Sequence, residues 1–249
     1  MRKIMKVYIL PFLTAIFIIS CISLAALGQS GTWSNAEWIG LEALEAEMRI
    51  VPGVHGFGDH LGKKGIKRSV VPMFRKDFII KDSIESARIN ISGLGHYELY
   101  LNGKKIGDRF LSPGWTNYQK RIFYNSFDIT EQLAEGGNAI GVLVGNGFYH
   151  VNRERYRKLV VAYGYPRLIF NIQIRYKSGV VENIVSDENC SVTPSPITFS
   201  SIYGGEDYDA RLEQEAWNTF AYDDSNWQKS IVLDDSMEKL VPEKDHPLL

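Results

Sequence analysis

Alternation of apolar and polar residues with a period of two is the feature that most constrains this chain. It is clearest over residues 168–176, where five large apolar side chains are separated by single residues. Because successive side chains of a strand point to opposite faces of a sheet, each such segment predicts a β-strand. Segments 87–92, 97–101 and 139–144 predict further strands, the last of them buried on both faces. The pattern predicts a core that contains Ile89, Ile91, Tyr97, Leu99, Ile140, Val142, Phe170, Ile172 and Ile174.

Turn residues divide the chain into short strands, and helical signals are few. Asn102-Gly103 follows a strand directly, and both residues tolerate the positive φ of a tight hairpin. Ser178-Gly179 is a second turn. Helical propensity is confined to residues 41–48, to one capped turn at 128–133 and to one or two turns at 151–158. Strands with almost no intervening helices predict an all-β fold, an antiparallel β-sandwich or jelly roll.

The composition excludes several classes of protein. With 249 residues, 45% of them hydrophobic, the chain can bury a sizeable core, which excludes wholesale disorder. A formal net charge of −1 without a basic cluster argues against nucleic acid as a partner. Two cysteines cannot form a disulfide framework or a zinc site. Cys190, with the acidic Glu188 nearby, is expected to be a small buried hydrophobe and not a reactive thiol.

Residues 1–28 have the form of an export signal. Three basic residues within the first six precede an almost wholly apolar run over residues 7–27, and Ala26-Leu27-Gly28 offers small residues to signal peptidase. Two alternatives remain open, namely lipid attachment at Cys21 and an uncleaved membrane anchor. Each alternative predicts an exported protein, which would be periplasmic, attached to the cell surface or secreted.

Two stretches carry motifs that are narrow in their residue types. They are Pro113-Gly-Trp-Thr-Asn-Tyr118 and Ile202-Tyr-Gly-Gly-Glu-Asp-Tyr-Asp-Ala-Arg211. Around them stand Gly93-Leu-Gly-His-Tyr-Glu-Leu-Tyr-Leu-Asn-Gly103, Gly145-Asn-Gly-Phe-Tyr149 and Asp223-Asp-Ser-Asn-Trp227. In this order the motifs resemble the N-terminal β-sandwich of bacterial α-L-rhamnosidases. The looser frame that they share resembles the galactose-binding-like sandwiches of many glycosidases.

The resemblance implies that catalysis belongs to another part of the enzyme. Rhamnosidases of this family are inverting glycoside hydrolases with acid and base carboxylates in a C-terminal (α/α)6 barrel, and inversion needs two carboxyls about 6.5–9.5 Å apart. No barrel sequence precedes Leu249, so we assign no catalytic residue and expect the barrel as a missing or separate partner. The expected divisions are a signal peptide (1–28), a segment with a glycine-rich surface insertion (29–86), the sandwich (87–216) and the truncated start of the next module (217–249).

Three functions remain open on this basis. The first is an accessory, carbohydrate-binding-like module of an exported α-L-rhamnosidase, inactive alone. The second is an autonomous exported protein that binds rhamnose-containing glycans without cleaving them. The third is a purely structural sandwich that braces the barrel.

Candidate sugar-binding residues lie in two aromatic loops and in the acidic motif that follows them. Aromatic rings can stack on the CH faces of a pyranose, although large aromatics at the rim of a sandwich more often serve packing. The acidic residues could hold sugar hydroxyls, or could instead order the segment that leads to the next domain. The candidates are Trp115, Tyr118, Asn146, Tyr149, Glu206 and Asp207, with Phe148 beside them.

No cofactor is required by these motifs, but calcium is one candidate ligand. Asn117 and Asn146 offer neutral oxygens of the kind that hold Ca²⁺ in binding modules. The resemblance implies that rhamnose can be bound through calcium in such a module, without placing its ligands residue by residue. His55 and His60, with Asp59 between them, could form a metal site, but their glycine-rich loop supplies no rigid spacing.

Overall fold

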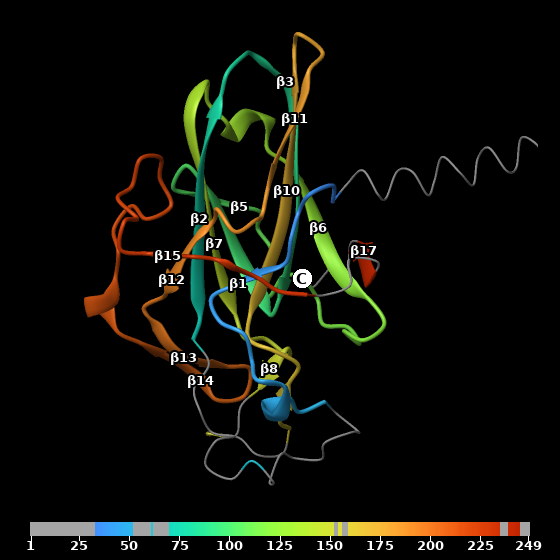
Figure 1. The fold of residues 1–249 in the computed structure, drawn as a ribbon, viewed down its shortest axis with the longest axis vertical. Helices are drawn as coiled ribbons and strands as arrows, with labels where there is room; N and C mark the ends of the chain where they lie inside the picture. Colours follow the sequence, from blue (N-terminus) through green and yellow to red (C-terminus); the bar gives the residue numbers. More distant parts are fainter. Residues whose placement is uncertain are drawn as a thin grey trace, which may run out of the picture. The chain divides into compact units, whose positions relative to one another are not determined.

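The computed structural model describes residues 33–51, 61, 70–151, 154–155, 159–234 and 239–244. Every element named below belongs to one compact unit, Asn35–Leu249. Within this unit two β-sheets lie face to face, as Figure 1 shows, and apolar side chains from both sheets meet between them. The predicted all-β sandwich is therefore confirmed.

The first sheet contains seven strands. At its centre β3 (Ile84–Leu94) pairs antiparallel with β10 (Arg167–Tyr176) on one side and with β6 (Ile122–Asp128) on the other. The shorter strands are β1 (Ile39–Gly40), β11 (Val181–Val185), β16 (Ile231–Val232) and β17 (Leu240–Pro242). β17 runs parallel to β6, whereas the other pairings among the described residues are antiparallel.

The second sheet contains six strands in the order β15-β12-β2-β7-β4-β5. Their bounds are β2 (Pro72–Ile80), β4 (His96–Leu101), β5 (Lys104–Ile106), β7 (Gly136–Gly145), β12 (Ser191–Pro194) and β15 (Gln228–Lys229). Two small sheets pair β8 (His150–Val151) with β9 (Val161–Ala162), and β13 (Ile197–Ser201) with β14 (Gly205–Tyr208). The two large sheets thus include strands that precede segment 87–216 in the sequence and strands that follow it.

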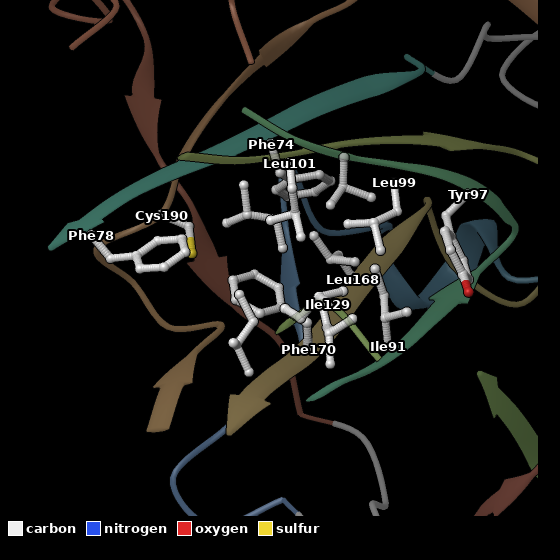
Figure 2. Close-up of a cluster of buried hydrophobic side chains, with 14 of the residues drawn as sticks. Phe74, Phe78, Ile91, Tyr97, Leu99, Leu101, Ile129, Leu168, Phe170 and Cys190 are labelled. Atoms are coloured by element: carbon white, nitrogen blue, oxygen red, sulfur yellow. The ribbon is translucent and has the colours of Figure 1, made fainter. Parts of the chain in front are cut away.

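The core lies between the two large sheets. Figure 2 shows Phe74, Leu99 and Leu101 of the second sheet facing Leu168 and Phe170 of the first. Burying a large apolar side chain contributes roughly 1.5–3 kcal/mol, so this layer is the main source of stability. All nine residues that the alternation places in the core are buried, namely Ile89, Ile91, Tyr97, Leu99, Ile140, Val142, Phe170, Ile172 and Ile174.

The predicted hairpin at Asn102-Gly103 joins β4 to β5. Both residues have positive φ, 50° and 80°, as a tight hairpin requires. The Asn102 side chain also binds the neighbouring strand, because its Oδ1 accepts the Ala139 N–H at 2.9 Å and its Nδ2 donates to Asn138 Oδ1 at 2.8 Å. This asparagine therefore fixes the hairpin against β7 as well as forming the turn.

The helical predictions had mixed outcomes. Residues 128–133 form the expected capped turn, with 3-10 helix η3 (Thr130–Gln132) and Asp128 Oδ1 accepting the Thr130 N–H at 3.0 Å. A helix over 41–48 is wrong, because only η1 (Ala46–Met48) forms there. Leu41 instead packs against the core, and its carbonyl accepts a hydrogen bond from Gln228 Nε2 at 2.8 Å. Tertiary packing thus overrides a weak local propensity.

Part of the outer face of the second sheet, over β2 and β7, is covered by a segment that we call the strap, residues 213–227, which follows η4 (Ala210–Leu212). Arg75 of β2 holds it in place, with its guanidinium bonded to Asp224 Oδ2 at 2.5 Å and to the carbonyls of Trp217 and Thr219 at 3.0 and 3.1 Å. Asp77, two residues along β2, is also paired with Arg75. A buried arginine requires such partners, so this cluster fixes the strap to the sheet.

Several sequence predictions fall outside the described residues. They are the leader 1–28, the His55-Asp59-His60 group with most of the glycine-rich insertion, and most of the turn at 151–158.

Cys190 is fully buried, and burial raises the pKa of its thiol to about 11, which agrees with a structural and unreactive cysteine. In the portion of the chain that the structure describes, no helix is both long and apolar enough to cross a membrane.

Candidate functional site

One pocket lies where the β3–β4 turn meets the end of β7 and the β13–β14 hairpin. The turn and the end of β7 approach so closely that a Cβ on Gly95, whose φ is +119°, would lie 1.9 Å from the Gly145 carbonyl oxygen. Only glycine fits at position 95, which explains the glycine of the β3–β4 turn. The pocket beside this contact has a volume of about 540 Å³, within the range of small-molecule sites.

Both polar and apolar side chains line the pocket. Glu98, Glu206 and Ser200 supply oxygen atoms, whereas Phe110 and Leu111 supply exposed apolar surface. Burial raises the pKa of Glu98, but hydrogen bonds from Lys105 and Tyr100 outweigh burial and hold that pKa below its ordinary value. The Glu98 carboxylate is therefore charged at neutral pH and can accept hydrogen bonds.

Three aromatic side chains, two of them exposed and one half-buried, form a group near this pocket that we call the aromatic row. Trp115 stacks on Phe148 with ring centroids 4.7 Å apart, and Phe148 meets Tyr203 edge-on at 6.1 Å. Trp115 is 61% exposed and Tyr203 is 47% exposed. Phe148 and Tyr203 directly follow Gly147 and Ile202, which line the pocket. Two residues of the row are therefore sequence neighbours of the pocket wall, while none of the three rings is part of that wall.

Tyr118 and Tyr149, two of the predicted sugar contacts, belong instead to a buried aromatic group. Tyr118 meets Tyr149 edge-on at 5.3 Å and Tyr163 at 5.6 Å, and Tyr149 stacks on Tyr163 at 5.8 Å. Both predicted residues are less than a tenth exposed, and burial raises the pKa of Tyr118. Both rings pack the two loops against each other, and contact of either tyrosine with a sugar stays a prediction.

The other predicted residues divide between the pocket and its outer side. Asn146 and Glu206 line the pocket, where Asn146 Nδ2 donates to the Ser200 carbonyl at 2.7 Å and Ser200 Oγ donates to Glu206 Oε1 at 3.2 Å. Asp207 is paired with Arg155 at 2.5 Å and is not part of the pocket wall. The pocket thus holds Asn146 and Glu206, and the aromatic row holds Trp115.

The two asparagines proposed for calcium have other contacts. Asn117 is exposed, and its Oδ1 accepts the Gln119 N–H at 3.1 Å within its own turn. Asn146 uses its amide nitrogen to hold the β13 backbone. Within the described ranges, no group of three or more histidine, cysteine, aspartate or glutamate side chains could hold a metal ion. Calcium binding therefore stays a prediction.

Sequence reasoning missed His96, Glu98 and Phe110 in the pocket wall. A signal was available for the first two, because they alternate with the core residues Tyr97 and Leu99 and must point away from the core. Burial lowers the pKa of His96, with the nearby charge of Glu243 opposing that effect, so its ring is neutral at neutral pH. Phe110 had no comparable signal, because its loop has no regular period.

Comparisons with known proteins agree on one family. The family model described as the α-L-rhamnosidase N-terminal domain matches residues 82–249. An α-L-rhamnosidase of Formosa agariphila is 42% identical over 160 residues, which are 62% of this chain and 17% of that enzyme.

Solved structures are similar in the same way. The α-L-rhamnosidase of Aspergillus terreus is 32% identical with a TM-score of 0.68, over 84% of this chain and 22% of that one. The α-L-rhamnosidase of Streptomyces avermitilis, solved in complex with L-rhamnose, is 30% identical with a TM-score of 0.61, over 68% of this chain and 16% of that one. This chain therefore spans about a fifth of the length of these relatives. It belongs to the α-L-rhamnosidase N-terminal domain family.

Proposed function

We propose that this module is an accessory carbohydrate-binding part of an exported α-L-rhamnosidase, and that it holds rhamnosyl residues at the aromatic row and the adjoining pocket. The observation that carries the proposal is the exposed ring of Trp115, stacked on the half-buried Phe148, near a pocket that contains carboxylate and hydroxyl oxygens. A large exposed aromatic group contributes little to folding, and such patches mark binding surfaces.

The chemistry of the surface suits a neutral deoxy sugar. The open face of Trp115 can stack on the CH face of a pyranose, while Glu98, Glu206 and Ser200 can accept hydrogen bonds from its hydroxyls. The methyl group of rhamnose would lie against the apolar side of the pocket, where Phe110 and Leu111 are exposed. The rhamnose bound to the Streptomyces avermitilis relative supports the choice of sugar class.

Hydrolysis is proposed to belong to a catalytic barrel elsewhere in the full protein. A general acid needs a raised pKa and a second carboxyl across the scissile bond. Asp207 is paired with Arg155, and hydrogen bonds from Arg211 hold the pKa of Asp209 below its ordinary value. We therefore predict no turnover of p-nitrophenyl α-L-rhamnoside by this chain. Turnover that Glu206→Gln abolishes would contradict the assignment.

Isothermal titration of the purified protein with methyl α-L-rhamnoside tests the binding function. One stacked ring and a few hydrogen bonds predict a Kd between millimolar and high micromolar, about −4 to −5.5 kcal/mol. Trp115→Ala is expected to weaken binding about tenfold, a loss of about 1.4 kcal/mol. Tyr208→Ala is the matched control, because Tyr208 is similarly exposed but lies outside both the row and the pocket wall.

The same titration tests the remaining alternatives. Repeating it with EDTA decides whether calcium takes part, since a cation that holds sugar hydroxyls would make binding sensitive to chelation. Unchanged affinity in both Trp115→Ala and Glu206→Gln would remove the row and the pocket from the site. Absence of binding in every variant and in the wild type would favour a module that only braces the barrel.

A further inference from the structure

Glu243, which directly follows β17, places a carboxylate beneath the loop that carries Trp115. Its side chain is only 10% exposed. Its backbone N–H donates to the Tyr124 carbonyl at 2.9 Å, which fixes the residue beside β6. The Nη1 atom of Arg109 lies 4.0 Å from Oε2 of Glu243. A carboxylate this buried is costly unless hydrogen-bond donors surround it.

Both oxygens of this carboxylate have donors, and the two donors come from different parts of the fold. Oε1 accepts the backbone N–H of Gly114 at 2.9 Å, and Oε2 accepts Asn125 Nδ2–H at 2.6 Å. Asn125 is itself buried, and its Oδ1 accepts the Tyr97 hydroxyl at 2.7 Å. A continuous chain of hydrogen bonds therefore runs from β4 through β6 and the residue after β17 to the loop.

The loop is held at three alternate residues, and Trp115 lies among them. The Ser112 carbonyl accepts the Tyr97 N–H at 2.7 Å, Gly114 donates to Glu243, and Thr116 Oγ1 donates to the Arg121 carbonyl at 2.6 Å. Gly114 has little room for a side chain, because a Cβ there would lie 2.6 Å from Glu243 Oε1. The carboxylate thus occupies the space that the glycine of the Gly-Trp-Thr motif leaves free.

We propose that Glu243 is a positioning residue that fixes Trp115 in its stacked arrangement on Phe148 and so presents the aromatic row to a sugar. A hydrogen bond to a charged acceptor is stronger than one between neutral groups, so the Gly114 amide is firmly held. The role in binding rests on the proposed function, but the role in ordering the loop does not. Glu243 does not itself contact the sugar in this proposal.

Amide hydrogen exchange, followed by NMR, tests the positioning directly. In Glu243→Ala the Gly114 amide is expected to exchange at least about tenfold faster than in the wild type, because its acceptor is gone. Core amides such as those of Ile91 and Phe170 should keep their protection. Equal acceleration at Gly114 and in the core would show a general loss of stability and would overturn the proposal, as would unchanged exchange at Gly114.

Three further variants separate positioning from simple destabilisation. Glu243→Gln keeps an oxygen for Gly114, and the Asn125 amide can turn to accept the new N–H, so protection should largely return. Gly114→Ala displaces the carboxylate without removing it, and should reproduce the effect of Glu243→Ala. Lys244→Ala, at the exposed neighbour of Glu243, is the control and should change nothing. Failure of Glu243→Gln to restore protection would count against the hydrogen bond as the cause.

A double-mutant cycle with methyl α-L-rhamnoside as the probe tests the link to binding. Glu243→Ala should weaken the Kd about tenfold in the wild type and leave it unchanged in a Trp115→Ala background, because both changes remove the same contact. Equal weakening in both backgrounds would contradict the link through Trp115. If the wild type does not bind the probe, the proposed function fails, while the exchange experiment still decides whether Glu243 orders the loop.

Discussion

The same two loops build two aromatic groups with opposite surroundings. Trp115 and Tyr118 are three residues apart in one loop, and Phe148 and Tyr149 are neighbours in the other. Trp115 and Phe148 stack at the surface, whereas Tyr118 and Tyr149 meet inside against Tyr163. Each loop therefore contributes one ring to the buried group and one to the exposed row.

The difference in burial indicates different roles, because the buried tyrosines stabilise the loops whereas the aromatic row is available to a ligand. The buried tyrosines contact one another edge-on or stacked, the geometries in which aromatic pairs add to stability. The aromatic row, in contrast, leaves much of its apolar surface exposed to water. Such exposure does not stabilise the fold and is typical of a binding surface. A rigid buried group beneath an exposed one is the arrangement expected of a loop that must present a ring in one position.

The largest expected effect is on the buried side of this comparison. Tyr149→Ala removes a ring that is almost fully buried, so the free energy of unfolding should fall by about 3–5 kcal/mol, as for other buried aromatic residues. Tyr149→Phe is the matched control, because it keeps the ring and should cost less than about 1.5 kcal/mol. Urea denaturation with a fixed m-value measures both. A cost for Tyr149→Ala below about 1 kcal/mol would break the comparison.

The second largest expected effect is on the pH dependence of stability and concerns His150, the first residue of β8, which directly follows Tyr149. Its ring is fully buried, stacks on Tyr165 at 5.2 Å and places Nδ1 3.0 Å from the Gly164 carbonyl. Burial lowers its pKa to about 4, although the Gly164 carbonyl opposes the shift. The carbonyl must accept from an N–H, so the neutral ring carries its proton on Nδ1.

The sign of the pH dependence follows from this lowered pKa. Above the unfolded value of about 6.5 both states are neutral and the contribution of His150 to stability is complete. As the pH falls below 6.5, His150 becomes protonated in the unfolded state but stays neutral in the native state. The free energy of unfolding should therefore fall by about 2 kcal/mol between pH 7 and 5. Urea titrations of wild type and His150→Gln at both pH values measure it. Burial also lowers the pKa of His96, so His96 contributes to the pH dependence of stability over the same pH range. The variant His96→Gln is the control that measures this second contribution.

The core could be predicted from sequence, because burial on one sheet face imposes a period of two that survives in the residues themselves. Ile89, Ile91 and the alternating residues of β10 show it directly. The hairpin at Asn102-Gly103 was predictable for a similar reason, since positive φ restricts the residue types.

The site was predictable only in part, because loop residues have no period. Asn146 and Glu206 reach the pocket, but the motifs could not show that Trp115 is exposed while Tyr118 is buried. Nor could they show that Arg75 binds the strap or that Glu243 reaches Gly114, since these contacts join residues more than 120 positions apart. Such pairings depend on tertiary geometry that no local pattern records.

The smallest expected effect on stability is at the most exposed ring of the comparison. Trp115→Ala removes a side chain that is 61% exposed and packs on one ring, Phe148, so the free energy of unfolding should fall by less than about 1 kcal/mol. The same variant should lose most of the sugar affinity, which Tyr149→Phe should keep. Urea denaturation beside titration with methyl α-L-rhamnoside separates the two effects. A loss of stability for Trp115→Ala as large as that for Tyr149→Ala would mean that the row is a structural extension of the buried group, because exposure would then not distinguish binding from packing.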